Sequence, residues 1–154
     1  MRKYRGYSEV LHTWLYGDVM AVANSVAICK PTDFEFDGHH IRQIADEPLY
    51  VNESSVGEFI GKKDINGKEI YLGDIVAQTY KEYNGQITPD VGEVRYDEVN
   101  ARFYISKNTK YGEKKYPFRD SVIHQDGNAT ICLTPQYEVL GNVYENSEIL
   151  ETIN

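Results

Sequence analysis

Few residues in this sequence have the types and spacing that catalysis or metal binding requires. His39 and His40 are the only adjacent histidines, and neighbouring side chains on a strand point to opposite faces, which disfavours a shared metal ion. The sequence contains no Ser-His-Asp spacing, phosphate-binding glycine loop or His-Glu-x-x-His motif. We therefore predict that the protein is not an enzyme and binds no metal and no other cofactor. An enzyme assembled from residues scattered along the chain is the alternative.

Two aspartates, Asp64 and Asp74, could form a pair of carboxylates for acid–base chemistry, because both flank one predicted hairpin. Aspartates beside tight turns more often accept hydrogen bonds from backbone N–H groups. We therefore expect both residues to have a structural role.

Five tyrosines of the predicted strands could line an aromatic binding groove: Tyr71, Tyr80, Tyr83, Tyr96 and Tyr104. They could equally be half-buried strand residues whose hydroxyl groups lie at the sheet edge. The second interpretation is the one that we expect.

One basic segment, residues 107–119, carries a net charge of +4, whereas the whole chain carries −8 and the rest of it therefore −12. Aromatic residues alternate with its lysines, a pattern found in single-stranded nucleic-acid binding. Because the overall negative field repels phosphates, we favour a protein partner and keep nucleic acid as the alternative. Gly112 and Pro117 predict a long polar loop here. Its candidate partner-binding residues are Lys110, Tyr111, Lys114, Lys115 and Tyr116.

The composition of the 154-residue chain favours β-structure. Val and Ile total 26 residues and Tyr adds 13, whereas Leu and Ala together total 14. β-Branched and aromatic side chains suit strands, and the strong helix formers are scarce. Turn signals recur every eight to twelve residues, which is typical of a small sandwich or barrel.

The order of these signals predicts the elements. In the first part we expect a strand over residues 11–16, a turn at Gly17-Asp18 and a returning strand over 19–23, followed by a hairpin of 34–36 with 39–44 and a helical turn capped by Asn52. In the second part we expect a type I′ turn at Asn66-Gly67, a tight turn at Gly73-Asp74, strands over 75–80, 91–96, 101–106, 130–133 and 137–144, and a short helix through Leu150.

Three motifs in order resemble the signature of the YopX family. They are Arg5-Gly6 with WLYG at residues 14–17, VNESSVGEF with Gly61 and DINGKEIYLGDI at residues 51–75, and EVLGNVYENSEIL at residues 138–150. The resemblance implies a small, mostly β protein of bacteriophages and prophages, located in the cytoplasm of the bacterial host, with no established activity and no catalytic residues to carry over. The family-motif residues, which we expect to be structural, are Gly57, Gly61, Asp64, Asn66, Gly67, Ile70, Tyr71, Gly73, Asp74, Gly141, Asn142, Glu145 and Asn146.

The succession of motifs over 73–76, 92–94 and 103–105 is also similar to small SH3-like barrels. We therefore expect a mostly β fold with very little helix: an SH3-like barrel over about residues 58–145, within a region 51–154 that ends in a short helix. Residues 1–50 would form an N-terminal β-hairpin region that packs on the barrel, because so short a segment does not hold a core alone.

Function follows from these expectations. We predict an accessory protein of the YopX type that acts as a non-enzymatic protein-binding β module, with a host or phage protein as its partner. A nucleic-acid-binding module that uses residues 107–119 is the alternative, although nucleic acid is the less favoured partner. A homo-oligomer stays open. No segment has the length of apolar residues that a membrane span needs. The distant pair Cys29 and Cys132 fits a reducing cytoplasm.

Overall fold

The computed structural model describes residues 3–29, 34–36, 38, 41–43, 49–81 and 87–152. The chain forms two compact units, residues 1–59 and residues 60–154, and each is described by itself. Fifteen strands, one turn of 3-10 helix and one short α-helix lie within the described residues, and every strand pairing given for them is antiparallel. The prediction of a mostly β fold with very little helix is confirmed.

The first unit contains a sheet in the order β6-β3-β2-β1, with the start of β7 beside β1. Its elements are β1 (Tyr4–Ser8), β2 (Thr13–Val22), β3 (Ser25–Cys29), β4 (Phe34–Phe36), β5 (Ile41–Gln43), β6 (Leu49–Val51) and the 3-10 turn η2 (Glu53–Ser55). Strands β4 and β5 pair as the predicted second hairpin, and the Asn52 side chain caps η2 by accepting from Ser54 N–H, as predicted.

The predicted turn at Gly17-Asp18 is wrong, because β2 runs straight through both residues. The chain turns instead before and after β2, where His12 (φ 50°) and Ala23 (φ 53°) take left-handed conformations. A Cβ atom on Gly17 would lie 2.2 Å from the backbone oxygen of Cys29. Glycine is therefore needed at this position for the close approach of β3, and its presence does not signal a turn.

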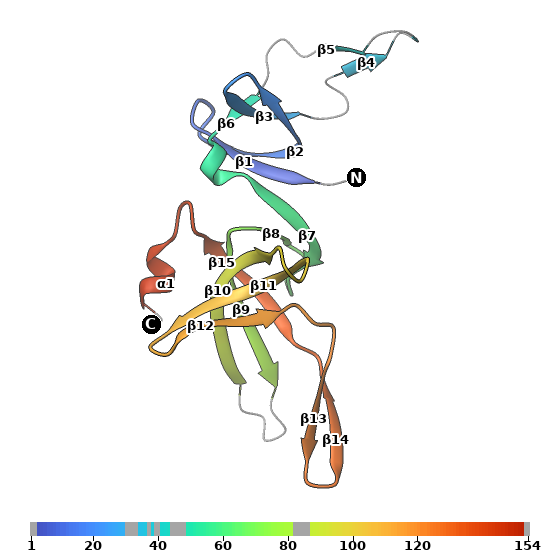
Figure 1. Ribbon diagram of the computed structural model, residues 1–154, viewed down its shortest axis with the longest axis vertical. Coiled ribbons are helices and arrows are strands. Elements are labelled where there is room, and N and C mark those ends of the chain that lie inside the picture. Colours follow the sequence, from blue (N-terminus) through green and yellow to red (C-terminus); the bar gives the residue numbers. More distant parts are fainter. Residues whose placement is uncertain are drawn as a thin grey trace. The chain divides into compact units, whose positions relative to one another are not determined.

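The second unit contains a five-stranded sheet in the order β12-β11-β10-β9-β15, together with the β7–β8 hairpin and a separate β13–β14 hairpin (Figure 1). Its elements are β7 (Gly57–Lys63), which begins in the first unit, β8 (Glu69–Tyr71), β9 (Asp74–Lys81), β10 (Ile87–Asp97), β11 (Arg102–Thr109), β12 (Gly112–Pro117), β13 (Val122–Asp126), β14 (Ala129–Leu133), β15 (Gln136–Asn142) and the helix α1 (Glu148–Thr152).

The core of the second unit lies on one face of this sheet. Alternate residues of β9, β10, β11 and β15 point to the same side, and Val76, Val94, Ile105 and Tyr137 form one buried cluster there with Ile70 of β8. The β7–β8 hairpin is joined to the sheet edge, because Ile65 N–H donates to the Tyr137 carbonyl oxygen (2.9 Å). The opposite side of β10, β11 and β12 carries polar side chains.

The predicted hairpin at Asn66-Gly67 is present, but its type I′ geometry is wrong. Gly67 has a positive φ of 80°, whereas Asn66 is not among the residues with positive φ. Gly67 N–H donates to the Asp64 carbonyl oxygen (3.0 Å), and the Asp64 carboxylate accepts from Asn66 N–H and Lys68 N–H (2.8 Å each). This carboxylate anchors a longer turn in which only the glycine must be left-handed.

The predicted long loop over residues 107–119 is also wrong. Strand β11 continues to Thr109, and β12 returns beside it with Thr109 opposite Gly112. The left-handed φ of Gly112 (112°) belongs to the turn, and Pro117 ends β12 at the sheet edge. Both residues therefore bound a strand, in positions that strands tolerate.

The other strand and turn predictions of the second unit agree with the structure. Gly73 is left-handed (φ 82°) in the turn before β9, and the hairpin predicted from 91–96 and 101–106 is β10–β11. Strand β13 was not predicted. Among the described residues no pairing joins β12 to β15, so the five-stranded sheet is open.

The packing of residues 1–50 on the later residues stays a prediction. None of the helices in the described part of the chain has the length and apolarity needed to cross a bilayer.

Candidate functional site

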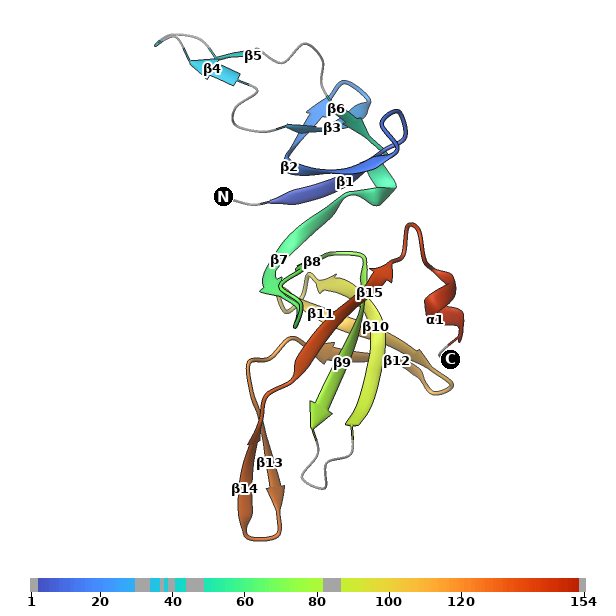
Figure 2. The same ribbon diagram turned by 180° about the vertical axis from the view of Figure 1, so that it is seen from behind.

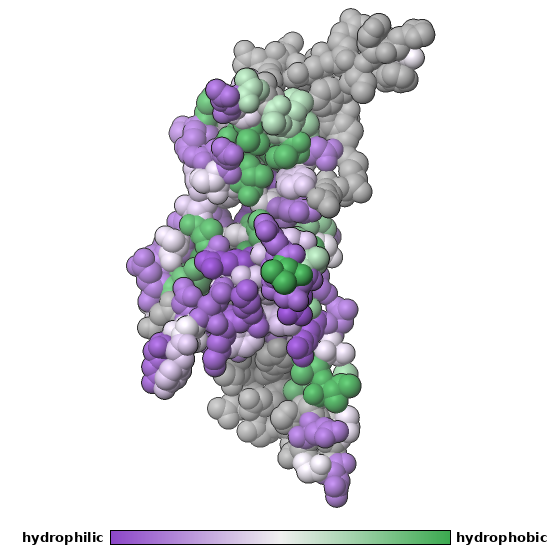
Figure 3. Space-filling view, in the orientation of Figure 1, coloured by the Kyte–Doolittle hydropathy of each residue, from purple (hydrophilic) through white to green (hydrophobic). Residues whose placement is uncertain are grey.

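The polar side of β10, β11 and β12, opposite the core, brings together a set of charged side chains, which we call the polar face. Because directly opposed residues of antiparallel strands share a side, the pairings Arg95–Tyr104, Glu93–Ser106 and Ser106–Lys115 place these residues on one surface. Figure 3 shows a mostly hydrophilic surface over these strands. The polar face consists of Glu93, Arg95, Asp97, Tyr104, Ser106, Glu113 and Lys115, with Asn100 from the β10–β11 turn.

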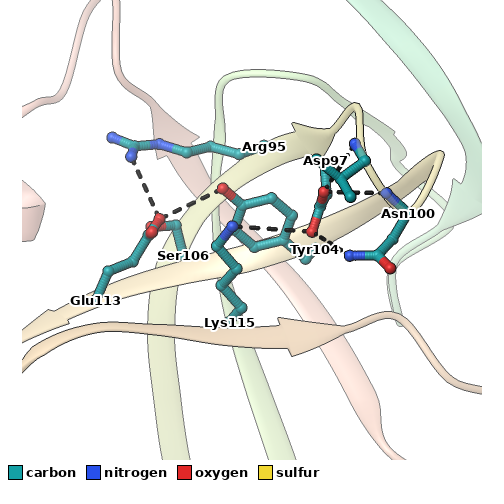
Figure 4. Close-up of polar contacts among 8 residues, drawn as sticks. Arg95, Asp97, Asn100, Tyr104, Ser106, Glu113 and Lys115 are labelled. Atoms are coloured by element: carbon teal, nitrogen blue, oxygen red, sulfur yellow. Dashed lines mark hydrogen bonds and ion pairs between the residues drawn. The ribbon is translucent and has the colours of Figure 1, made fainter.

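Glu113 is the centre of the first half of the polar face (Figure 4). Its Oε1 accepts hydrogen bonds from Ser106 Oγ (2.6 Å) and Tyr104 OH (3.3 Å), and Arg95 Nη1 lies 3.5 Å away. The Ser106 hydrogen bond, with smaller contributions from the Lys115 charge, the Tyr104 hydroxyl and the Arg95 charge, lowers the pKa of Glu113 despite some burial. Glu113 is therefore held as a carboxylate by its surroundings.

Arg95 is held between two carboxylates. Its Nη2 lies 2.6 Å from Glu93 Oε2 and its Nε donates to the same oxygen at 2.8 Å. Both nitrogens thus contact a single carboxylate oxygen, and the Glu93 hydrogen bond is the largest cause of the raised pKa of Arg95. The guanidinium group is thus fixed in direction on the surface.

Asp97 and Lys115 form the second half of the polar face. The Asp97 carboxylate accepts from Asn100 Nδ2 (2.9 Å), Val99 N–H (3.1 Å) and Asn100 N–H (3.2 Å), and the Asn100 side chain is the largest cause of its lowered pKa. Lys115 Nζ lies 3.8 Å from Asp97 Oδ2 and 4.9 Å from the centre of the Tyr104 ring. Asp97 is buried although it is charged, and its hydrogen bonds compensate for the lost water.

A small pocket lies on the same side where α1 meets β10. Its lining includes Val91, Glu93, Arg95 and Ser106 of the strands and Leu150 of α1. The lining therefore combines two apolar side chains, Val91 and Leu150, with polar groups. Together with the paired charges, the pocket suits recognition of a polar surface by directed hydrogen bonds and ion pairs.

The structure separates the five predicted partner-binding residues. Lys115 belongs to the polar face, whereas Tyr116 points to the other side and packs against the core cluster, where burial raises its pKa. Lys114 lies opposite Lys107 on that other side. Lys110 and Tyr111 occupy the tip of the β11–β12 hairpin, with Lys110 Nζ 4.9 Å from the centre of the Tyr111 ring. Tyr111 is 84% exposed.

The basic charge of the segment is partly neutralised. Lys107 Nζ lies 2.8 Å from Asp90 Oδ1, and this hydrogen bond raises the pKa of Lys107. Lys115 faces Asp97, as described above. The segment therefore presents less uncompensated positive charge than its sequence indicates.

The structure describes the side chains of three of the five tyrosines that were considered for an aromatic groove. Tyr71 and Tyr104 are buried, while Tyr96 is half exposed and its ring contacts that of Phe103 in a tilted arrangement, at 5.1 Å between ring centres. The side chain of Tyr80, and the whole of Tyr83, lie outside what the structure describes. The predicted His39–His40 pair also lies outside the described residues.

The family-motif aspartates bind the backbone of turns. The carboxylate of Asp64 also accepts from Val139 N–H of the edge strand β15 (3.1 Å), in addition to its two bonds within the turn. Fully buried Asp74 accepts from Tyr71 N–H (2.8 Å). Burial raises the pKa of Asp64, but the backbone hydrogen bonds from Val139, Lys68 and Asn66 outweigh it, and the net shift is downward.

The closing motif forms a second hydrogen-bonded turn after β15. Asn142 Oδ1 accepts from Tyr144 N–H (3.0 Å) and Glu145 N–H (2.9 Å), and its Nδ2 donates to Glu145 Oε2 (2.9 Å). A Cβ atom on Gly141 would lie 2.6 Å from Asn146 Oδ1. These motif residues hold the chain between the sheet and α1.

Sequence analysis missed most of the polar face. Glu93, Arg95 and Asp97 match no catalytic or metal-binding motif, and they alternate with other residues along one strand. Charges alternating with apolar residues indicate one solvated side of a strand. That signal was available, but the partners on β11 and β12 depend on the strand register.

Among the described residues no group of three or more His, Cys, Asp or Glu side chains could hold a metal ion. The fold and the polar face define a class of protein: an antiparallel β protein with an open sheet and a charge-paired surface. The match to the family model of YopX protein extends over residues 3–151, so the chain belongs to the YopX family. A search of the curated proteins gave no match to this chain.

Proposed function

We propose that this YopX-family protein is a non-enzymatic protein-binding β module and that the polar face is its binding surface. The observation that carries the proposal is the pairing of charges on that face. Arg95 lies between Glu93 and Glu113, and Lys115 lies beside Asp97. Side chains of both signs are fixed in direction before any partner arrives, which lowers the cost of ordering them on binding.

The same pairing favours a protein over a nucleic acid. Binding to a phosphate backbone depends on cations that replace condensed counterions. Here the two cations of the polar face lie 2.6–3.8 Å from carboxylates, and the whole chain has a net charge of −8. A protein surface can present both signs in a complementary order. Exposed Tyr111 at the nearby hairpin tip adds aromatic contact area of the kind enriched at protein interfaces.

Recovery of partners from a bacterial lysate tests the proposal. The bait is the tagged full-length chain, compared with a variant that combines Arg95→Gln and Glu113→Gln. A matched control combines Glu98→Gln with Arg119→Gln, which removes one charge of each sign from exposed positions outside the polar face. We expect the control to recover the same protein as the unmodified chain, and the polar-face variant to lose at least about tenfold, or about 1.4 kcal/mol, of binding.

If the polar-face variant recovers as much partner protein as the unmodified chain, the polar face is not the binding surface. The nucleic-acid alternative has its own test, a gel shift with single-stranded and duplex oligonucleotides. Retardation that weakens steeply between about 50 and 200 mM salt would support the alternative.

The SH3-like barrel belongs to the same proposal. Strands β9, β10 and β11 form an antiparallel meander after the Gly73 turn, and the β7–β8 hairpin contacts the edge strand β15 through Ile65 and Tyr137. These contacts support partial closure of the sheet around the core. Nuclear Overhauser contacts that continue from β7 around the open sheet edge would establish the barrel, and their absence would leave an open sheet.

The cellular setting is proposed from the family. The YopX motifs lead us to propose an origin in a bacteriophage or prophage and a location in the cytoplasm of the host. Fractionation of host cells that express the tagged chain tests the location.

A further inference from the structure

The β13–β14 hairpin, residues 122–133, forms a separate two-stranded sheet, which we call the arm. Figures 1 and 2 show it projecting away from the five-stranded sheet of its own unit. No other strand in the described part of the chain pairs with either of its edges. A two-stranded hairpin is only marginally stable in water and gains stability from a third strand or a packed layer.

Strand β14 of the arm lacks the charges and prolines that protect exposed edges. Natural edge strands usually carry lysine, inward-pointing charges, proline or bulges, but residues 122–133 contain no Lys, Arg, Glu or Pro. Ile123 is 70% exposed and lies directly opposite exposed Cys132. Figure 3 shows a hydrophobic patch on the arm near the point where it leaves the sheet. The arm therefore offers an unguarded edge for a further strand.

Strand β14 is the better of the two edges. Its sequence, Ala-Thr-Ile-Cys-Leu, has no acidic or basic residue, whereas β13 contains His124 and Asp126. Because the whole chain carries −8, two copies repel each other over much of their surface. The uncharged β14 is a place where two copies can meet without that repulsion.

We propose that β14 pairs in antiparallel fashion with β14 of a second copy of this chain, so that two arms form one four-stranded sheet around a twofold axis. A twofold interface brings the same strand from both copies. The antiparallel direction carries the two arm tips, each with its Asp126, to opposite ends of the joint sheet. Pairing over five residues is small beside a standard interface, so the dimer is weak and depends on concentration.

The register of this pairing follows from the hairpin. The two-residue turn has a positive φ at Gly127 (58°) and not at Asn128, the pattern of a type II′ turn. The two residues that flank such a turn form a hydrogen-bonded pair. Along the hairpin, opposed residues then alternate between non-hydrogen-bonded and hydrogen-bonded pairs. By this alternation Thr130 and Cys132 direct their backbone groups outward from β14. Among the registers that pair these outward-directed residues, full overlap of the two five-residue strands places Thr130 of one copy opposite Cys132 of the second copy.

The first experiment measures the mass of the full-length chain in solution by analytical ultracentrifugation between about 1 µM and about 1 mM. We expect the weight-average mass to rise towards twice that of the monomer, and Thr130→Lys to prevent this rise. The control is Val99→Lys, which places the same charge on a 93% exposed residue of the β10–β11 turn. A monomer at every concentration, or a dimer unchanged in Thr130→Lys, overturns the proposal.

The second experiment tests the register by crosslinking. In a Cys29→Ser background, Thr130→Cys places a thiol opposite Cys132 of the second copy at the separation of a hydrogen-bonded strand pair, about 5.5 Å between Cα atoms, which a disulfide can span. Mild oxidation should give a covalent dimer. Asn128→Cys at the exposed tip is the matched control and should give at least fivefold less. A covalent dimer formed equally by the control overturns the pairing, and an unchanged circular dichroism spectrum verifies folding of each variant.

Discussion

Two consecutive hairpins of the second unit, β11–β12 and β13–β14, have different relations to the rest of the fold. The first lies in the five-stranded sheet, where Ile105 is completely buried, and its outer strand β12 carries Glu113, Lys114, Lys115 and a terminal proline. The second pairs only with itself among the described residues, and its strands contain one acid and no Lys or Arg. The charges and the proline of β12 thus protect the edge of the five-stranded sheet, whereas the arm has almost no charged residues and leaves its edge unprotected.

The comparison also changes how the basic segment is understood. Its net charge of +4 was a reason to expect a binding loop. In the fold, neighbouring lysines of β12 lie on opposite sides of the sheet, and Lys107 and Lys115 have acidic neighbours. Charge density along a sequence therefore does not establish charge density on a surface.

The largest expected difference between the two hairpins is the loss of stability when an isoleucine is replaced by alanine. Ile105→Ala should destabilise the second unit by about 2–5 kcal/mol, because it removes buried methyl groups and leaves a cavity. Ile123→Ala in the arm should change the free energy of unfolding by no more than about 0.5 kcal/mol. Urea denaturation at a few micromolar protein measures both. Equal losses would show that the arm packs against the core.

A second test removes the carboxylate that joins the β7–β8 turn to β15. Asp64→Ala leaves the N–H groups of Asn66, Lys68 and Val139 without this acceptor, which should cost about 1–3 kcal/mol. Asp120→Ala, which removes an exposed carboxylate from an ion pair with Lys62, is the matched control and should cost less than about 1 kcal/mol. Chemical denaturation distinguishes the two.

The lowered pKa of Asp64 predicts that the stability of the second unit depends on pH. The folded state lowers the pKa of Asp64, so the stabilisation is fully present above the pKa of the unfolded chain, about 4. It is lost as the pH falls through the lower pKa of the folded state. Denaturation midpoints between pH 7 and pH 2 should therefore fall more steeply in the unmodified chain than in Asp64→Ala. Parallel curves would contradict this role.

A third test compares the two left-handed turn glycines, Gly67 (φ 80°) and Gly127 (φ 58°). A valine at Gly67 should cost about 1–2 kcal/mol, because a β-branched side chain strains a left-handed backbone. Gly127→Val should strain only the arm turn and leave the main unfolding transition unchanged. Thermal unfolding measures the first effect, and amide hydrogen exchange of β13 and β14 measures the second. A shift of the main transition by Gly127→Val would argue against an independent arm.

The smallest expected effect on stability comes from removing the lysines of β12. Lys110→Ser, Lys114→Ser and Lys115→Ser together should change the free energy of unfolding by about 0.5 kcal/mol, mostly through Lys115 and its contact with Asp97. Without lysines the β12 edge resembles the arm, so association at high protein concentration should increase. Light scattering of the triple variant beside the unmodified chain provides the measurement. Unchanged association would show that other features of β12 protect this edge.

Much of the local structure could be predicted from the residues themselves. The scarcity of Leu and Ala favoured strands, Asn52 marked the 3-10 turn, and Gly67 and Gly73 marked turns that require left-handed backbone. These predictions agree with the fold because each depends on the conformational preferences of a few adjacent residues. The YopX motifs include the turns at Gly67 and Gly73, and their other residues lie partly in strands.

Other features depended on contacts between distant segments. Gly17 appeared to be a turn residue, but it lies within β2, where the Cys29 backbone approaches too closely for a side chain. Residues 107–119 appeared to be a loop, because glycine, proline and lysine are common in loops and equally suited to the end and edge of a strand. In both cases the residue type allowed two structures, and the neighbouring strand decided between them.

The sequence by itself determined that this is a β-rich chain with turns at defined glycines and with the motifs of the YopX family. Only the tertiary structure decided which charges meet. Glu113 reaches Ser106, Tyr104 and Arg95 because β10, β11 and β12 align in one register, and a shift of one residue would move each side chain to the opposite side of the sheet. Register is a property of paired strands, and the polar face and the arm edge both depend on it.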